Sequence, residues 1–213
     1  MIKRYFREPV SSLTHLSGAV LALIGTIILF INTSIFTPAV VCSILIFGIS
    51  MIALYATSGI YHLVRAKDVI IEKLRKLDHS MIFVLIAGSY TPFCLLVLDG
   101  FWQWGILTLI WALAILGITL KMFWMNMPRV LSTAFYIGMG WLALIVIKPL
   151  HVALAPQAFF LLVLGGVMYT IGGVIYALKL PNFSEEFGFH ELFHIFVMLG
   201  SLCHYLIVLN FLL

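Results

Sequence analysis

Three histidines in the sequence have the residue type and the spacing of a metal site. His190 and His194 are four positions apart, so on a helix both rings project from one face, about 6 Å apart along the axis. His62 supplies a third nitrogen if its own segment lies opposite. Three neutral histidines leave the fourth position of a tetrahedral zinc ion open for water, as in catalytic zinc sites. The sequence therefore predicts a zinc site at His62, His190 and His194.

Two further polar residues are predicted to lie beside these histidines. Ser58 precedes His62 by one helical turn, and Asp78 stands at the start of another apolar segment. Zinc lowers the pKa of a bound water to about 7, and a carboxylate beside it can orient that water or act as general base. We therefore interpret Asp78 and Ser58 as candidate catalytic residues, with Ser58 as a hydrogen-bonding neighbour. The alternative is that the whole set consists of hydrogen-bonded packing residues.

The segment His190-Glu191-Leu192-Phe193-His194 also matches the H-E-x-x-H motif of zinc metalloproteases. Leu98-Asp99-Gly100 resembles the second motif of intramembrane proteases. The predicted topology argues against a protease, because Asp99 falls at the other end of a span, about 30 Å from the histidines. The order of the two motifs is also reversed relative to those proteases.

The other four histidines are assigned lesser roles. His15 opens the first apolar segment and is expected to approach the same cavity as a neighbour of the metal ligands. His204 follows His194 by ten positions, too far to share its ion, and is expected to line a polar path through the bundle. His79 is expected at a helix interface and His151 in a loop.

The elements that position these residues are membrane spans. Of the 213 residues, 63% are hydrophobic and 9% are charged, whereas soluble domains are about 45–50% apolar and about 25% charged. Backbone hydrogen bonding in lipid favours helices over other spanning structures. The apolar segments long enough to span are about 16–36, 38–63, 79–98, 101–123, 130–150, 158–180 and 190–212. The sequence therefore predicts an all-α integral membrane protein, with one seven-transmembrane helix domain over residues 1–213.

The basic residues are distributed by membrane side. Eleven of the twelve Lys and Arg, beginning with Lys3, Arg4 and Arg7, flank the spans on one side, and Lys148 alone lies on the other. The positive-inside rule therefore predicts a cytoplasmic N-terminus and an external C-terminus, the reverse of a G-protein-coupled receptor. The same distribution accounts for the net charge of +4 without a nucleic-acid partner. The odd number of cysteines, three in all, argues against a disulfide framework.

An ordered set of short motifs extends over almost the whole chain. The motifs are Glu8-Pro9 to Thr14-His15, Ser58-Gly59-Ile60-Tyr61-His62, Leu77-Asp78-His79, Ile86-Ala87-Gly88-Ser89-Tyr90-Thr91-Pro92-Phe93, Met139-Gly140-Trp141, His190-x3-His194 and Cys203-His204-Tyr205. Together they resemble the bacterial hemolysin III family, which is related to the progestin and adiponectin receptors and, more remotely, to the alkaline ceramidases. The resemblance implies a seven-helix bundle whose cytoplasmic-side zinc is bound by the residues that match His62, His190 and His194. Asp78 and Ser58 match the positions that hold the water on that zinc.

Three functions are weighed from these expectations. The first is a zinc-dependent lipid hydrolase with ceramidase-like amide hydrolysis near the cytoplasmic leaflet, which has membrane lipids as its partners and no indicated protein partner. The second is a non-enzymatic membrane-homeostasis or sensor protein in which zinc mainly clamps the helices. The third is cytolysis, which the resemblance also brings in. It is disfavoured because a secreted pore-forming protein must first be soluble in water, and this sequence has no face that would make it soluble.

Overall fold

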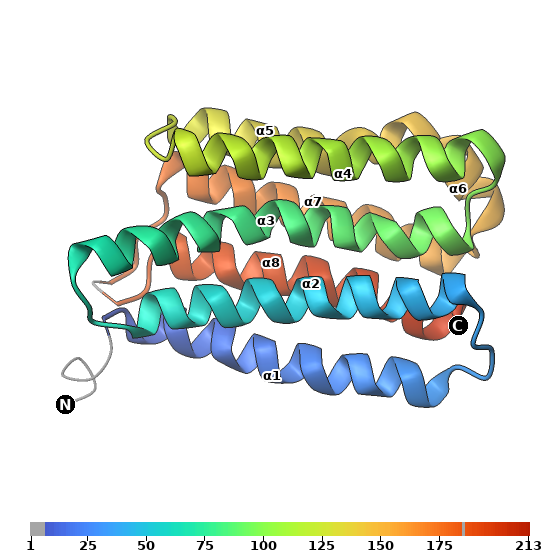
Figure 1. Cartoon of the computed structure of the whole chain (residues 1–213), viewed down its shortest axis with the longest axis horizontal. Coiled ribbons are helices and arrows are strands. Elements are labelled where there is room, and N and C mark those ends of the chain that lie inside the picture. The colour runs from blue at the N-terminus through green and yellow to red at the C-terminus, as the bar shows by residue number, and fades with distance from the viewer. Residues whose placement is uncertain (1–6, 185) are drawn as a thin grey trace.

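The computed structural model describes residues 7–184 and 186–213, and it confirms the seven-span bundle. Within those residues, seven helices are long and apolar enough to cross a membrane. They lie side by side along the long axis of the molecule (Figure 1). In chain order the elements are α1 (Pro9–Asn32), α2 (Pro38–Leu63), α3 (Asp68–Leu96), α4 (Gly100–Phe123), α5 (Arg129–Trp141), the 3-10 helix η2 (Leu142–Val146), α6 (Ile147–Ala153), α7 (Pro156–Leu178), α8 (Phe189–Ile207) and the π-helical end η3 (Val208–Leu212). The fifth span consists of α5, η2 and α6, and the seventh of α8 and η3.

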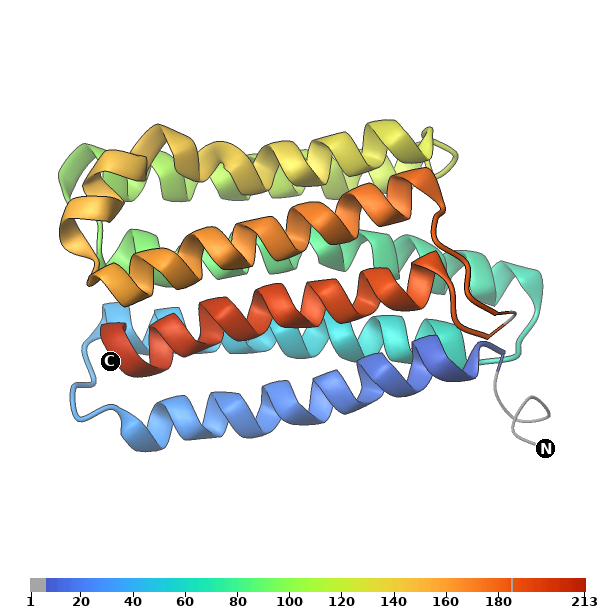
Figure 2. The same cartoon turned by 180° about the vertical axis from the view of Figure 1, so that it is seen from behind.

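The helices form two rows, with α1 closing one side. In Figure 1, α4, α3 and α2 lie in front, and Figure 2 shows α5, α7 and α8 on the other face. The first helix contacts both α2 and α8, so the first and last spans of the chain are neighbours. Lys3 and Arg4, which support the predicted orientation, lie outside the described residues. We call the end of the bundle where α1 begins the N-terminal end.

Two helices begin earlier than the hydropathy pattern predicts. The first begins at Pro9 rather than near residue 16. Its initial turns carry the polar residues Ser11, Ser12 and His15, so they do not belong to the apolar segment of the sequence. These side chains are nevertheless part of the helix, because they are buried against other helices rather than exposed to lipid. The third begins at Asp68, so most of the charged stretch 65–78, expected as a break, is helical. Such a stretch is rich in Lys, Arg, Glu and Leu, which favour helix. The start of α3 extends beyond its neighbours in Figure 1, where charged residues need not enter lipid.

The fifth span is not one continuous α-helix, contrary to the prediction. Pro149 has no amide hydrogen to donate to the carbonyl of Ile145, and the 3-10 helix η2 contains that carbonyl. Tyr90 of α3 binds at this interruption. Its hydroxyl donates to the carbonyl of Gly140 at 2.6 Å and accepts from the amide of Ala143 at 2.8 Å. An aromatic side chain from α3 therefore replaces part of the backbone hydrogen bonding that the irregular helix lacks.

Glycine allows α1 to approach α2 closely beside the histidines. Gly59 stands one turn before His62, and its carbonyl accepts a hydrogen bond from Ser12 Oγ at 3.0 Å. A Cβ at Gly59 would lie 2.7 Å from Leu16 Cγ and 3.0 Å from the Leu16 backbone nitrogen. The absence of a side chain at this position therefore sets the distance between the two helices.

Replacing Gly59 with alanine is expected to lower the thermal stability of the purified protein. The added methyl group meets backbone of α1, so the helices must separate, and overpacking of this kind costs about 1–3 kcal/mol. The gain in helix propensity, about 1 kcal/mol, offsets part of this cost. Gly105→Ala has the same propensity gain, but its nearest neighbouring atom is 3.9 Å away, so it serves as the control. Equal melting temperatures for the two variants would contradict the prediction.

Candidate metal centre

The three predicted metal ligands meet at the N-terminal end of the bundle. His62 lies in the last turn of α2, and His190 and His194 lie in the first turns of α8. One ring nitrogen from each falls within 4.8 Å of the others. The Nε2 atoms of His62 and His190 are 3.1 Å apart. Two nitrogens bound tetrahedrally to zinc at about 2.0–2.1 Å lie about 3.3 Å apart, so this separation fits a shared ion.

The second ring nitrogen of His62 is held by Glu8. Nδ1 of His62 lies 2.5 Å from Glu8 Oε2, while Arg7 Nε lies 3.2 Å from the other carboxylate oxygen. Burial alone would raise the pKa of Glu8, but the hydrogen bond with His62 and the positive charge of Arg7 lower it, and the pKa lies below its usual value. An ionised Glu8 accepts a hydrogen bond from Nδ1–H, which leaves Nε2 with a lone pair for a metal.

Replacing Glu8 with glutamine is expected to weaken metal binding by about 10–100-fold, the usual effect of losing a carboxylate partner of a metal-binding histidine. Competition with a chelator of known affinity measures the change on purified protein. Glu72→Gln is the control, because Glu72 is 63% exposed and pairs with Lys76 within α3. Unchanged affinity in Glu8→Gln would show that the carboxylate does not hold His62 as a ligand.

Glu191, the acid of the H-E-x-x-H segment, forms the start of α8. Its Oε2 accepts from the amide of Gly188 at 2.9 Å, and its Oε1 accepts from Ser11 Oγ at 2.5 Å. Both carboxylate oxygens are therefore engaged in capping the helix and joining it to α1. Asp99 directly precedes α4, at the end of the bundle opposite the histidines (Figure 1). This arrangement agrees with the argument against a protease.

Asp78 and Ser58 line a cavity within the bundle. The cavity has a volume of about 340 Å³, and both residues line it together with His190 and His194. The Asp78 carboxylate accepts a hydrogen bond from the Ser58 hydroxyl. Asp78 is 8% exposed and Ser58 2%, so neither is a surface residue. The structure therefore brings together all five residues predicted for the site.

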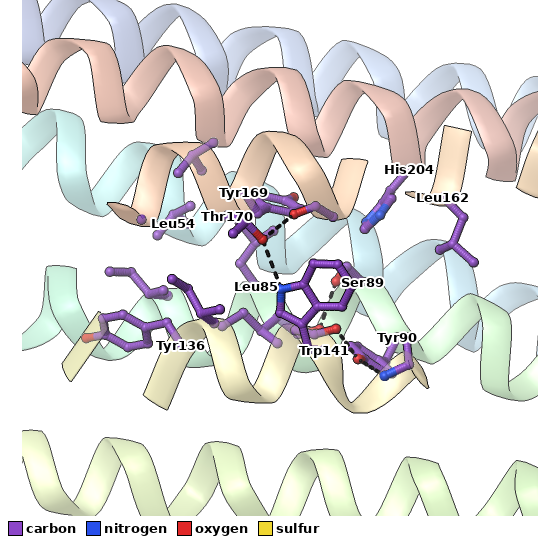
Figure 3. A pocket seen from close by; sticks show the side chains of 18 of the residues that line it. Leu54, Leu85, Ser89, Tyr90, Tyr136, Trp141, Leu162, Tyr169, Thr170 and His204 are labelled. Atoms are coloured by element: carbon purple, nitrogen blue, oxygen red, sulfur yellow. Dashed lines mark hydrogen bonds between the residues drawn. The ribbon is translucent and has the colours of Figure 1, made fainter. Parts of the chain in front are cut away.

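The cavity extends from this site along the bundle and is mainly apolar. It lies among α2, α3, α5, α7 and α8. Figure 3 shows its middle part, where the indole Nε1 of Trp141 donates to Thr170 Oγ1 at 3.0 Å and so joins α5 to α7. His204 lines this part, but the lining is mainly apolar and does not form the polar path expected for His204. His79, expected at an interface, lines the cavity as well.

Comparison with known proteins places the chain in a family. A family profile described as "Haemolysin-III related" matches residues 3–205. "Hemolysin-3" of Bacillus cereus is 39% identical over 208 residues, which cover 97% of this chain and 92% of the relative. The chain belongs to the haemolysin-III-related family. As a member with seven spans, it is a multi-pass protein of the cell membrane.

Two further relatives extend this assignment. The "Hemolysin-3 homolog" of Bacillus subtilis (strain 168) is 37% identical over 206 residues, 95% of this chain and 92% of the relative. "Heptahelical transmembrane protein 5" of Arabidopsis thaliana is 30% identical over 152 residues, which are 61% of this chain and 39% of that protein. The resemblance to the haemolysin III family that the sequence motifs indicated is therefore confirmed over almost the whole chain.

In this haemolysin III family member, the contact between Glu8 and His62 was not predicted from the sequence. One signal was present, since Glu8 is the only acidic residue before Asp68 and directly precedes the proline that starts the first helix. Nothing in the local spacing connects Glu8 with His62, which is 54 positions away. The expected approach of His15 to the site is confirmed, because its ring lies against His194.

Proposed function

We propose that this protein binds zinc through His62, His190 and His194 and hydrolyses the amide bond of a membrane lipid. The observation that carries the proposal is that two histidines of the cluster line an apolar cavity, which Asp78 and Ser58 line as well. A water-soluble substrate would not require a cavity with such a lining, whereas an acyl chain fits it.

The donor set supports zinc as the ion. Three imidazole nitrogens suit zinc and other late first-row metals, while calcium and magnesium prefer oxygen ligands. The carboxylate of Glu8 behind His62 is the partner that metal-binding histidines usually have. When bound, zinc supplies Lewis-acid polarisation of a carbonyl and a nucleophile at neutral pH.

The protein side chains supply the proton transfers. The Asp78 carboxylate accepts the proton of the attacking water as the water oxygen bonds to the amide carbonyl carbon. The carbon–nitrogen bond then breaks, and the proton passes from Asp78 to the leaving nitrogen, so the products are a carboxylic acid and an amine. The Ser58 hydroxyl donates to Asp78 and keeps the carboxylate directed at the reacting atoms.

The test combines metal content with product formation. Protein purified in detergent without chelators is analysed by inductively coupled plasma mass spectrometry and incubated with ceramides labelled on the acyl chain. About one zinc per chain, with fatty-acid release that a chelator abolishes and added zinc restores, supports the proposal. Folded protein without metal contradicts it.

The same assay, with the melting temperature measured as well, distinguishes the hydrolase from the second function, a membrane-homeostasis protein with a structural metal. One observation favours it, since the histidines and Glu8 join the ends of α2 and α8 to the segment before α1. For that function, a chelator lowers the melting temperature, and no labelled lipid amide yields a product. Haemolysis by intact cells at native expression, absent from a deletion strain, is the corresponding test for cytolysis.

A further inference from the structure

His15 of α1 stacks on the ring of His194. The two ring centroids are 3.5 Å apart and the ring planes differ by 6°. His15 is 2% exposed and His194 1%, so the pair is enclosed by protein. Within residues 7–184 and 186–213, neither ring nitrogen of His15 has a hydrogen-bond partner. The two histidines therefore contact each other through the faces of their rings.

A second aromatic residue also contacts His15. Tyr55 of α2 meets His15 edge to face, with centroids 5.2 Å apart. Its hydroxyl donates to Ser201 Oγ of α8 at 2.6 Å, and Ser201 also bonds the hydroxyl of Tyr169 at 2.8 Å. Gly18, almost one turn after His15, leaves room for Tyr55, since a Cβ there would lie 3.2 Å from Tyr55 Cγ. His15 is thus fixed by α2 and α8 as well as by its own helix.

His194 differs from His62 in what holds its ring. His62 has Glu8 behind it, whereas the buried Nδ1 of His194 has no hydrogen-bond partner in the described part of the chain. A metal-binding histidine needs its ring plane fixed, and the second nitrogen usually provides this. Other rings meet His194 at an angle, those of His62 and His190 among them, whereas His15 lies flat against it. The flat contact with His15 can therefore restrict rotation of the His194 ring.

We infer that His15 is a positioning residue, whose ring face fixes the plane of His194 so that one nitrogen stays directed at the metal. The inference rests on the metal site proposed above, and it explains how the ring of His194 is oriented in that site. Among the described residues, the nitrogens that converge on one point belong to His62, His190 and His194, and His15 is outside that group. Its contribution therefore comes from the aromatic face and not from a coordinating nitrogen.

The test compares His15→Phe, which keeps an aromatic face and removes both nitrogens, with His15→Leu, which removes the face as well. Co²⁺ and Zn²⁺ are titrated into detergent-purified, metal-free, full-length protein. We expect His15→Phe to bind within about twofold of the wild type and His15→Leu to bind about tenfold more weakly, as loss of an aromatic contact implies. The visible absorption spectrum of bound Co²⁺, which reports the geometry of its ligands, should change in His15→Leu only. Tyr55→Leu, which removes the support behind His15, should shift binding in the same direction.

Three results would overturn the inference. Equal affinity and an unchanged Co²⁺ spectrum in His15→Leu would show that the stack does not position His194. Equal losses in the Phe and Leu variants would show that a nitrogen of His15 is needed instead. If His15→Leu does not fold, the Tyr55→Leu variant decides the question. Wild-type metal affinity in Tyr55→Leu would then contradict the inference. Absence of metal binding by the wild type is a separate result, which removes the proposed metal site itself.

Discussion

Replacing His190 and His194 together with alanine is expected to reduce bound zinc from about one ion per chain to a level that mass spectrometry does not detect. Both ligands on α8 are then lost, and the single imidazole of His62 cannot retain the ion. The loss should be almost complete because His190 and His194 are two of only three converging nitrogen donors in the described residues. Metal analysis of protein purified without chelators measures it directly.

The control for this experiment is His151→Ala. The prediction that His151 lies in a loop is wrong, because this residue is part of the short helix α6. It is exposed there, and its ring contacts Phe159 rather than the three histidines. The variant should keep its zinc, and gel filtration should show that both proteins remain folded. Zinc retained in the folded double variant would mean that the ion binds elsewhere in the chain.

Replacing Asp78 with asparagine is expected to lower the turnover number by about 10²–10⁴-fold on any lipid amide that the wild type hydrolyses. Asparagine has nearly the same shape but no longer accepts the proton of the attacking water. The metal content should stay the same, because among the described residues Asp78 is not part of the group whose ligand atoms lie close together. Fatty-acid release and zinc are measured on the same preparation.

Asp68→Asn provides the comparison, since Asp68 begins the same helix but is exposed and does not line the cavity. That variant should turn over lipid at the wild-type rate. Full activity in Asp78→Asn would contradict the role proposed for this carboxylate. Loss of zinc together with activity would mean that Asp78 supports the metal site instead of the proton transfer.

Local patterns in the sequence predict much of the fold and the central site. The seven spans follow from hydropathy because lipid excludes unpaired backbone groups. The spacing of His190 and His194, and of Ser58 and His62, places each pair on one helix face without knowledge of the tertiary structure. The residues that these patterns identify are the ones that the structure brings together at one end of the bundle.

Other features depend on contacts that local spacing does not contain. Glu8 and His62 meet because α1 begins beside the end of α2, and His15 meets His194 because the first and last spans are neighbours. The irregular fifth span depends on Tyr90, a residue of α3. Each of these contacts joins segments far apart in the chain, so they follow only from the packed helices.

The neighbouring positions of the first and last spans affect the order in which the site is assembled. During synthesis, Glu8, His15 and His62 leave the ribosome while His190 and His194 have not yet been translated. A chain lacking only its final helix has one of the three nitrogen donors and cannot form the site. Binding of the proposed ion would therefore require α8 to have inserted beside α1 and α2, so metal content would report that these three helices are correctly assembled.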